Sequence, residues 1–330
     1  MLGRAILLLS ITLSLFGILW TPEFASQSQT PERAAVKNES LKRPAGQERA
    51  AGFTRQQLQQ ARQMPLPNID PEKVRAAVKT RELRRGAPGS TQAANTNKRP
   101  TQEYSGNLNT VPLEWAGKLY FTQDGDTWVC SAQFISPRVV LTAAHCARNS
   151  ETGAWSKDLA FYLQYKQGEY TEKYDYECVG TKQGWVTAGD QKWIYDFALI
   201  LVDHESITGN FGARWNWQDV DELHKIGYPG GMFNGEVLQV EQGPISVSSG
   251  IVTLQHGNEA EQAGSSGGGW IANFDYGSVA HGANQIASIE SFGIPAFPGV
   301  DFGPYLTDDF KELWDYVERG CKDEDEGKKQ

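Results

Sequence analysis

The large apolar side chains of this 330-residue chain are concentrated in its C-terminal part. Nine of the ten tryptophans lie between Trp115 and Trp314, whereas residues 26–103 contain a single aromatic residue, Phe53. A segment so poor in large apolar side chains buries too little surface to offset the entropy that it loses on folding. The pattern therefore predicts a low-complexity region at 26–103 and a folded region at 104–330.

Within the folded region the apolar residues form short runs separated by turn-forming residues. Asp124-Gly125, between the runs Lys118–Thr122 and Thr127–Phe134, is a strong signal for a hairpin turn. Further short runs predict strands at Val139–Thr142, Phe161–Tyr165, Phe197–Val202, Val237–Glu241, Ile245–Thr253 and Gln285–Phe292. Many short strands at close spacing are typical of a sandwich or a barrel.

The period of the apolar residues changes near the C-terminus. Positions i, i+3, i+4 and i+7 form one helical face there, namely Phe310, Leu313, Trp314 and Val317. Thr307 or Asp308 can cap the start of this helix, and Gly320 can end it. We therefore expect a mostly-β domain that closes with a C-terminal α-helix.

The first residues have the pattern of an export signal. Arg4 precedes the apolar stretch Ala5–Trp20, and Ala25 is a small residue suited to a cleavage point. The stretch is at the short end for a membrane span. Glu23 departs from a strict small-x-small cleavage pattern, so an uncleaved N-terminal anchor is the alternative. We expect a signal peptide at 1–25, no other membrane segment, and a secreted protein, extracellular or periplasmic.

The sign of the charge changes between the two remaining regions. Residues 31–103 carry 15 Lys/Arg against 7 Asp/Glu, and residues 104–330 carry 15 against 32. One interpretation is a solvated linker before an ordinary acidic secreted domain. The other is a basic pro-region attracted to the acidic domain at low ionic strength. An acidic folded domain argues against nucleic acid as a partner.

The cysteines and histidines limit the chemistry. Four cysteines suit an oxidising compartment and permit three pairings: they are Cys130, Cys146, Cys178 and Cys321. Four of the five histidines show no metal-ligand spacing, namely His204, His224, His256 and His281. We therefore expect no metal site and no cofactor.

The fifth histidine, His145, lies in Leu-Thr-Ala-Ala-His-Cys at 141–146, directly after a predicted strand. A histidine at a strand end can be purely structural. Cys130, however, can bridge back to Cys146, and a disulfide closing a loop of this size stabilises by about 3 kcal/mol in the chain-entropy model. Such a bridge would fix the turn that holds His145, as a general base requires.

Asp196 and Ser266 are the other candidates for catalysis. Asp196 opens an apolar strand, and a buried Asp that accepts the Nδ1–H of an imidazole fixes the tautomer of a catalytic histidine. Ser266 lies in Gly-Ser-Ser-Gly-Gly-Gly at 264–269. Glycines around a serine let the backbone turn sharply and let a substrate carbonyl approach two backbone N–H groups. A surface turn and a flexible linker are the respective alternatives, but linkers rarely lie between apolar strands.

Taken together, Thr-Ala-Ala-His-Cys, Asp-Phe-Ala-Leu and Gly-Ser-Ser-Gly-Gly resemble the signatures of the trypsin/chymotrypsin family of serine peptidases, in the order His, Asp, Ser. The resemblance covers about 117–319. It implies an all-β fold of two six-stranded antiparallel β-barrels with the active site in the cleft between them. Ser266 would be the nucleophile, His145 the general base and acid, and Asp196 the orienting carboxylate. The backbone N–H groups of Gly264 and Ser266 would form the oxyanion hole.

The resemblance also bears on the cysteines. Cys130–Cys146 matches the disulfide that flanks the catalytic histidine in the family. The terminal helix of the family packs back on the first barrel, where Cys178 is expected, so a Cys178–Cys321 bridge is our hypothesis for the second pair.

Two departures from trypsin matter. Ser265 stands where trypsin-like zymogens carry an Asp that pairs with the new N-terminus, so activation by that buried ion pair is not expected. The disulfides that brace the second barrel of trypsin are absent. These features, with Ile-Gly-Tyr-Pro-Gly at 226–230, resemble the bacterial and glutamyl-endopeptidase branch.

Specificity can be inferred in part. Ser291-Phe292-Gly293 resembles the strand along which a substrate backbone pairs and which forms one wall of the S1 pocket. Glu290 stands where Glu-specific relatives carry a histidine, so a preference for Glu is disfavoured. Glu290, or Glu261 on the opposite loop, can instead attract a Lys or Arg side chain, the alternative being that both face solvent.

The sequence thus predicts a secreted serine endopeptidase, made as a zymogen, that cleaves proteins or peptides through an acyl-enzyme, with its pro-region at 26–103 as a candidate partner. An α/β-hydrolase needs its Asp and His after the serine, and His281 is the only histidine that follows Ser266. A catalytically silent homologue that acts as a binding or adhesion module is the alternative, although such proteins usually lack a triad residue. A third possibility is an enzyme whose sole substrate is its own precursor.

Overall fold

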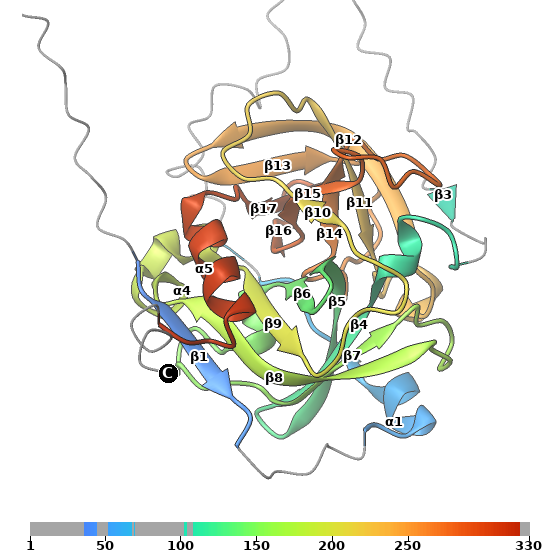
Figure 1. Cartoon of the computed structure of the whole chain (residues 1–330). Coiled ribbons are helices and arrows are strands. Elements are labelled where there is room, and N and C mark those ends of the chain that lie inside the picture. The colour runs from blue at the N-terminus through green and yellow to red at the C-terminus, as the bar shows by residue number, and fades with distance from the viewer. Residues whose placement is uncertain (1–35, 45–51, 68, 70–101, 104–107, 324–330) are drawn as a thin grey trace, which may run out of the picture. The chain divides into compact units, whose positions relative to one another are not determined.

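The computed structural model describes residues 36–44, 52–67, 69, 102–103 and 108–323 (Figure 1). The signal peptide expected at 1–25 lies outside these residues. No helix in the described ranges is long and apolar enough to cross a membrane.

Six antiparallel strands form a closed barrel. They are β4 (Ala116–Gln123), β5 (Asp126–Ser136), β6 (Val139–Thr142), β7 (Lys157–Leu163), β8 (Glu172–Lys182) and β9 (Ala198–Val202). Their order is β8-β7-β4-β5-β6-β9, and the pairing of β8 with β9 closes the ring. The Phe134 ring meets the rings of Phe161 and Tyr174 edge to face, with centroids 5.3 and 4.9 Å apart. Such aromatic contacts fill the inside of the barrel.

The hairpin between β4 and β5 turns at Asp124-Gly125, as the sequence predicts. Both residues have positive φ, 53° for Asp124 and 89° for Gly125. Two consecutive left-handed residues give the turn whose twist matches that of the flanking strands, and Asp-Gly is among the pairs that tolerate it best.

A second sheet follows along the chain. Its strands are β10 (Gly212–Ala213), β11 (Glu222–Gly227), β12 (Gln239–Ser248), β13 (Ile251–Gln255), β14 (Gly269–Ala272), β15 (Gln285–Ile289), β16 (Phe292–Gly293) and β17 (Val300–Pro304). They pair in the order β10-β15-β14-β11-β12-β13-β17-β16, and β3 (Gln102–Glu103) pairs with β12. The Ser288 hydroxyl on β15 donates to the carbonyl of Pro304 on β17 at 2.9 Å, which links the second strand from each end of this sheet.

Among the residues that the structure describes, the helices are few and short apart from the last one. They are α1 (Arg55–Gln60), α3 (Ala144–Ala147), α4 (Gly184–Thr187), α5 (Asp308–Glu318) and three 3-10 helices at Leu113–Trp115, Gly189–Tyr195 and Phe233–Gly235. The all-β class and the C-terminal helix are therefore as predicted.

Helix α5 returns to the first barrel and lies against β8 (Figure 1). A Cβ at Gly180 would lie 2.8 Å from Val317 Cγ2, so the glycine permits this close approach. The Cys178–Cys321 disulfide links β8 to the end of the helix, as we had hypothesised. The chain after the second sheet is thereby tied to the first barrel.

Ordered structure begins earlier than the composition predicts. Strand β1 (Asn38–Lys42) pairs antiparallel with β8, and β2 (Arg62–Gln63) pairs parallel with β5. Leu58 on α1 and Ile69 are only 2 % and 5 % exposed. The low-complexity region has too few apolar residues for a core of its own. Leu58 and Ile69 are instead buried in hydrophobic clusters formed with the rest of the domain.

Candidate active site

His145 is held by its backbone and by its ring. It lies on α3, one turn after β6, and its backbone N–H donates to Asp196 Oδ1 at 2.9 Å. Its ring Nδ1 lies 2.8 Å from Asp196 Oδ2. These two contacts keep the proton on Nδ1 and leave Nε2 as the basic nitrogen.

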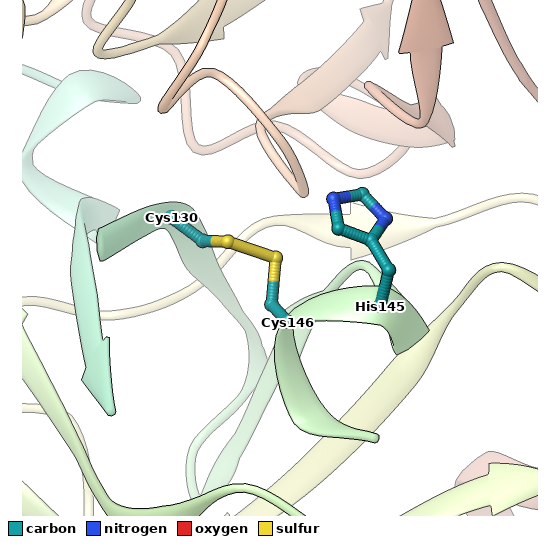
Figure 2. A group of neighbouring side chains, drawn as sticks. All are labelled: Cys130, His145 and Cys146. Carbon is teal, nitrogen blue, oxygen red and sulfur yellow. A yellow bond between two sulfur atoms is a disulfide. The ribbon is translucent and has the colours of Figure 1, made fainter. Parts of the chain in front are cut away.

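The Cys130–Cys146 disulfide joins the residue after His145 to β5 (Figure 2). This is the pairing that the resemblance implied. The two sulfurs and the imidazole lie close enough to suggest a metal site. A metal requires thiolates, however, and both sulfurs are in the disulfide. The bridge therefore braces the turn that carries His145.

Asp196 is fully buried between the 3-10 helix Gly189–Tyr195 and β9. Besides the two contacts with His145, its Oδ2 accepts a hydrogen bond from the Ser291 hydroxyl at 2.5 Å. Three donors thus surround the carboxylate and fix its orientation.

Ser266 lies in a loop that only glycines can form. Gly264 and Gly267 have φ of 87° and 80°, in the left-handed region. The Ser265 N–H donates to the carbonyl of Gln262 at 3.0 Å and the Gly268 N–H to that of Ser265 at 2.8 Å, so the loop turns twice. A Cβ at Gly267 would lie 2.6 Å from the backbone nitrogen of Ala143. The serine loop is therefore pressed against the turn that leads to His145.

The reactive atoms are covered in this structure. Ser266 is fully buried and His145 is 6 % exposed. Ser266 Oγ and His145 Nε2 are both buried, and neither has a hydrogen-bond partner among the described residues. The backbone N–H of Gly264, one of the expected oxyanion donors, is occupied: it donates to the carbonyl of Met64 at 2.8 Å. The composition of the region 26–103 did not predict that Met64 would bind Gly264.

A cavity of about 330 Å³ lies beside the serine loop. Its lining includes Glu259, Glu261, Gln262, Gly293 and Asp301. Glu261 and Gly293 thus line the cavity, and Ser291 and Phe292 precede Gly293 along the chain. Sequence reasoning missed Asp301, because a lone Asp on an unpredicted strand carries no motif.

Glu290 differs from both sequence expectations. Its side chain is fully buried, so it neither lines this cavity nor faces solvent. Its Oε2 lies 3.0 Å from Lys225 Nζ and 3.3 Å from Trp270 Nε1. The sequence did not indicate that a lysine on β11 faces this position.

Lys225 belongs to a buried cluster of charges next to the cavity. It pairs with Asp301 and with Glu290, and Glu241 Oε2 lies 3.6 Å from its Nζ. Its ammonium also donates to Gln262 Oε1 at 2.9 Å, at the start of the serine loop. Burial favours the neutral amine, but the three carboxylates outweigh it and raise the pKa of Lys225.

His256 is the second cation of the cluster. Its Nε2 lies 2.9 Å from Asp301 Oδ2 and its Nδ1 3.5 Å from Glu241 Oε1. Burial and the Lys225 ammonium favour the neutral ring, but the contacts with the two carboxylates outweigh them and raise the pKa of His256 to about 9.

The carboxyl groups of the cluster divide into two kinds. Burial raises the pKa of Asp301, but Lys225 and His256 lower it by more, so the pKa of Asp301 is below its usual range. Burial and the nearby Asp301 raise the pKa of Glu290 well above its usual range. Asp301 is therefore neutralised by two cations, whereas burial favours the protonated form of Glu290.

The comparisons with known proteins concern the family and the fold of the chain. A model of the trypsin family matches residues 104–297. No match was found among curated proteins. Many solved structures share the fold, and three of them serve as examples. The thermostable serine protease AL20 from an extremophilic microorganism is 22 % identical, with 62 % of this chain and 97 % of that chain covered and a TM-score of 0.53.

The other two structures match this chain with similar identity and coverage. Protease Anisep from Arthrobacter nicotinovorans is 21 % identical over 63 % of this chain and 96 % of that chain, with a TM-score of 0.54. A Glu endopeptidase is 20 % identical over 64 % of this chain and 94 % of that chain, with a TM-score of 0.53. The predicted chymotrypsin-like fold and the resemblance drawn from three short motifs are confirmed, and the chain belongs to the trypsin family of serine endopeptidases.

Proposed function

We propose that the protein is a secreted serine endopeptidase, made as a zymogen, that hydrolyses peptide bonds through an acyl-enzyme intermediate. The observation that carries the proposal is the Asp196 carboxylate, which holds both the backbone and the ring of His145. An imidazole fixed with its proton on Nδ1 is ready to act as a base at Nε2. Two disulfides and the N-terminal apolar stretch support export.

Each step of the reaction has a residue in this chain. Ser266 Oγ attacks the scissile carbonyl carbon while His145 Nε2 accepts the hydroxyl proton, and Asp196 stabilises the imidazolium. The backbone N–H groups of Gly264 and Ser266 stabilise the oxyanion that forms. His145 then donates the proton to the departing amine, the C–N bond breaks, and an ester to Ser266 remains. A water that gives its proton to His145 hydrolyses the ester and restores the serine.

The cavity beside the serine loop supports a preference for a basic side chain at P1. Glu259 and Glu261 line it and are exposed to solvent, whereas Asp301 is already neutralised by Lys225 and His256. Glu261, rather than Glu290, is therefore the residue we assign to this preference. A panel of peptides that vary at P1 tests it: Glu261→Gln should lower kcat/KM for Lys and Arg substrates and leave apolar ones unchanged.

A covalent label tests the catalytic proposal. The full chain would be cut briefly with a metallopeptidase, which fluorophosphonates do not label, and then assayed for casein cleavage and for fluorophosphonate labelling. The wild type should cut and label, Ser266→Ala should do neither, and Ser278→Ala should behave as the wild type. A folded, processed wild type that neither cuts nor labels would instead support the catalytically silent binding module.

A further inference from the structure

Residues 62–67 and Ile69 lie at the site where a substrate is expected to bind. Strand β2 lies parallel to β5, with Gln63 opposite Val129. The Met64 N–H donates to the carbonyl of Val129 at 3.0 Å, and the Met64 carbonyl accepts from the Gly264 N–H at 2.8 Å. One residue therefore bridges the strand that carries Cys130 and the loop that carries the nucleophile.

The side chain of Gln63 fills the space beside this loop. A Cβ on Gly264 would collide with Gln63 Oε1, and a Cβ on Gly230 would lie 3.2 Å from Gln63 Cγ. Gln63 Nε2 donates to the carbonyl of Asn234 at 3.3 Å. The amide is therefore packed against the oxyanion donor and is anchored on the side away from it.

The segment then continues past the cavity. Leu66 lines the cavity, and its Cδ1 would lie 3.3 Å from a Cβ at Gly293. Ile69 is 5 % exposed and belongs to a hydrophobic cluster with Ile251, Phe292, Ile294 and Phe302. The segment thus follows the wall on which a substrate backbone is expected to pair.

The segment runs through these contacts in the chain direction opposite to that of a bound substrate. In a substrate, the residue whose carbonyl occupies the oxyanion donors also places its side chain in the S1 pocket, and the preceding residues continue along the wall. Here the carbonyl belongs to Met64, whereas the residues at the cavity and at Phe292 are Leu66 and Ile69, which follow it in sequence.

We propose that Arg62–Ile69 is an intramolecular inhibitor that occupies the substrate cleft in the direction opposite to a substrate. The inference rests on the proposed peptidase function, because it assigns that site an occupant. A reversed segment satisfies the Gly264 N–H without presenting a bond in line for attack by Ser266. Pro65 and Pro67 strengthen the effect, since their fixed φ keeps the segment extended and lowers the entropy lost on docking.

Contacts upstream hold the inhibitor in place. Strand β1 pairs with β8 over five residues, and the Tyr120 hydroxyl donates to the carbonyl of Leu58 on α1 at 3.1 Å. Arg55 pairs with Glu169 at 2.6 Å. A tether of this kind keeps the segment at a high effective concentration at the cleft. A cut after Ile69 therefore does not free the site unless the segment also dissociates.

The test uses full-length chains and an exposed residue as the matched control. Ile69→Asp and Leu66→Asp would be compared with Ile207→Asp, since Ile207 is 59 % exposed and lies outside the cleft. Fluorophosphonate labelling of the uncut chain, identified by its mass, should accelerate about 10- to 100-fold in the two segment variants. The Ile207→Asp variant should label as slowly as the wild type, and equal rates in all four chains would overturn the inference.

A second measurement does not depend on activity. In the Ser266→Ala background, hydrogen exchange of residues 262–267 should be slow, should become fast when Ile69→Asp is added, and should stay slow with Ile207→Asp. Slow exchange in all three chains would overturn occupancy of the cleft. Fast exchange on adding Ile69→Asp, with no labelling in any serine-containing chain, would overturn the proposed peptidase function and still support the docked segment.

The direction of the segment can be tested with a peptide. A synthetic peptide of residues 62–69 should slow the labelling of the Ile69→Asp chain and remain uncut during prolonged incubation. Cleavage of that peptide within 62–69 would show binding in the productive direction and would overturn the reversed orientation.

Discussion

Ser291 Oγ lies 2.5 Å from Asp196 Oδ2, so the residue that begins the expected substrate wall also binds the carboxylate that orients His145. Asp196 comes from the first barrel and Ser291 follows β15 of the second sheet. Both groups are fully buried. His145, the proposed general base, is therefore oriented by groups from both halves of the domain.

Ser291→Ala should lower kcat more than it raises KM. Loss of a hydrogen bond to a buried charged group costs about 1.5–3 kcal/mol, which corresponds to roughly 10- to 100-fold in rate if the bond serves the transition state. Steady-state kinetics of the activated enzyme would measure this, with Ser278→Ala as the control. An unchanged kcat would show that His145 keeps its orientation without Ser291.

Where the apolar pattern is uninterrupted, the sequence predicts strands well. Val139–Thr142 has the same bounds in the structure as β6, because it is a continuous apolar run. Strand β8 was not predicted, because its charged residues hide the alternation. Lys182 is fully buried there and pairs with Glu312 of α5 at 3.0 Å, a partner 130 residues away that no local pattern reveals.

The site shows the same limit. The proposed triad residues follow from short motifs, because the chemistry proposed for them requires particular residues in particular local turns. The contacts of Glu290 with Lys225 and of Met64 with Gly264 depend on how distant strands meet. The composition of the region 26–103 shows how little apolar surface it has. It does not show that Ile69 packs into an apolar cluster with residues from another part of the fold.

Lys225→Met should destabilise the domain by about 3–5 kcal/mol, because it leaves buried carboxylates without their main cation. The serine loop should loosen as well, since Lys225 also binds Gln262. Thermal and urea unfolding would measure the effect, with the exposed Lys157→Met as a matched control. Equal stability of the two variants would show that His256 alone compensates the cluster.

His256 makes stability depend on pH in a defined direction. Its pKa of about 9 in the folded protein lies above the value of about 6.5 for an unfolded chain. Its contribution is therefore fully present below about pH 6.5 and is lost as the pH rises through about 9. The difference in unfolding free energy between the wild type and His256→Gln should be large at pH 6 and smaller at pH 9.5. Urea titrations at both values measure it, and a difference that grows with pH would contradict the assigned contacts.

The Cys178–Cys321 disulfide should contribute to stability and little to chemistry. It spans 143 residues and ties α5 to β8, whereas the triad is held by Cys130–Cys146 and Asp196. Replacing Cys178 and Cys321 together by Ala should lower the free energy of unfolding by about 2–5 kcal/mol. The kcat of the activated enzyme should stay unchanged at a temperature where the variant is folded. The matched double variant of Cys130 and Cys146 should lose kcat as well, because the turn that carries His145 is no longer braced. If both double variants lose kcat equally, α5 also positions the catalytic residues.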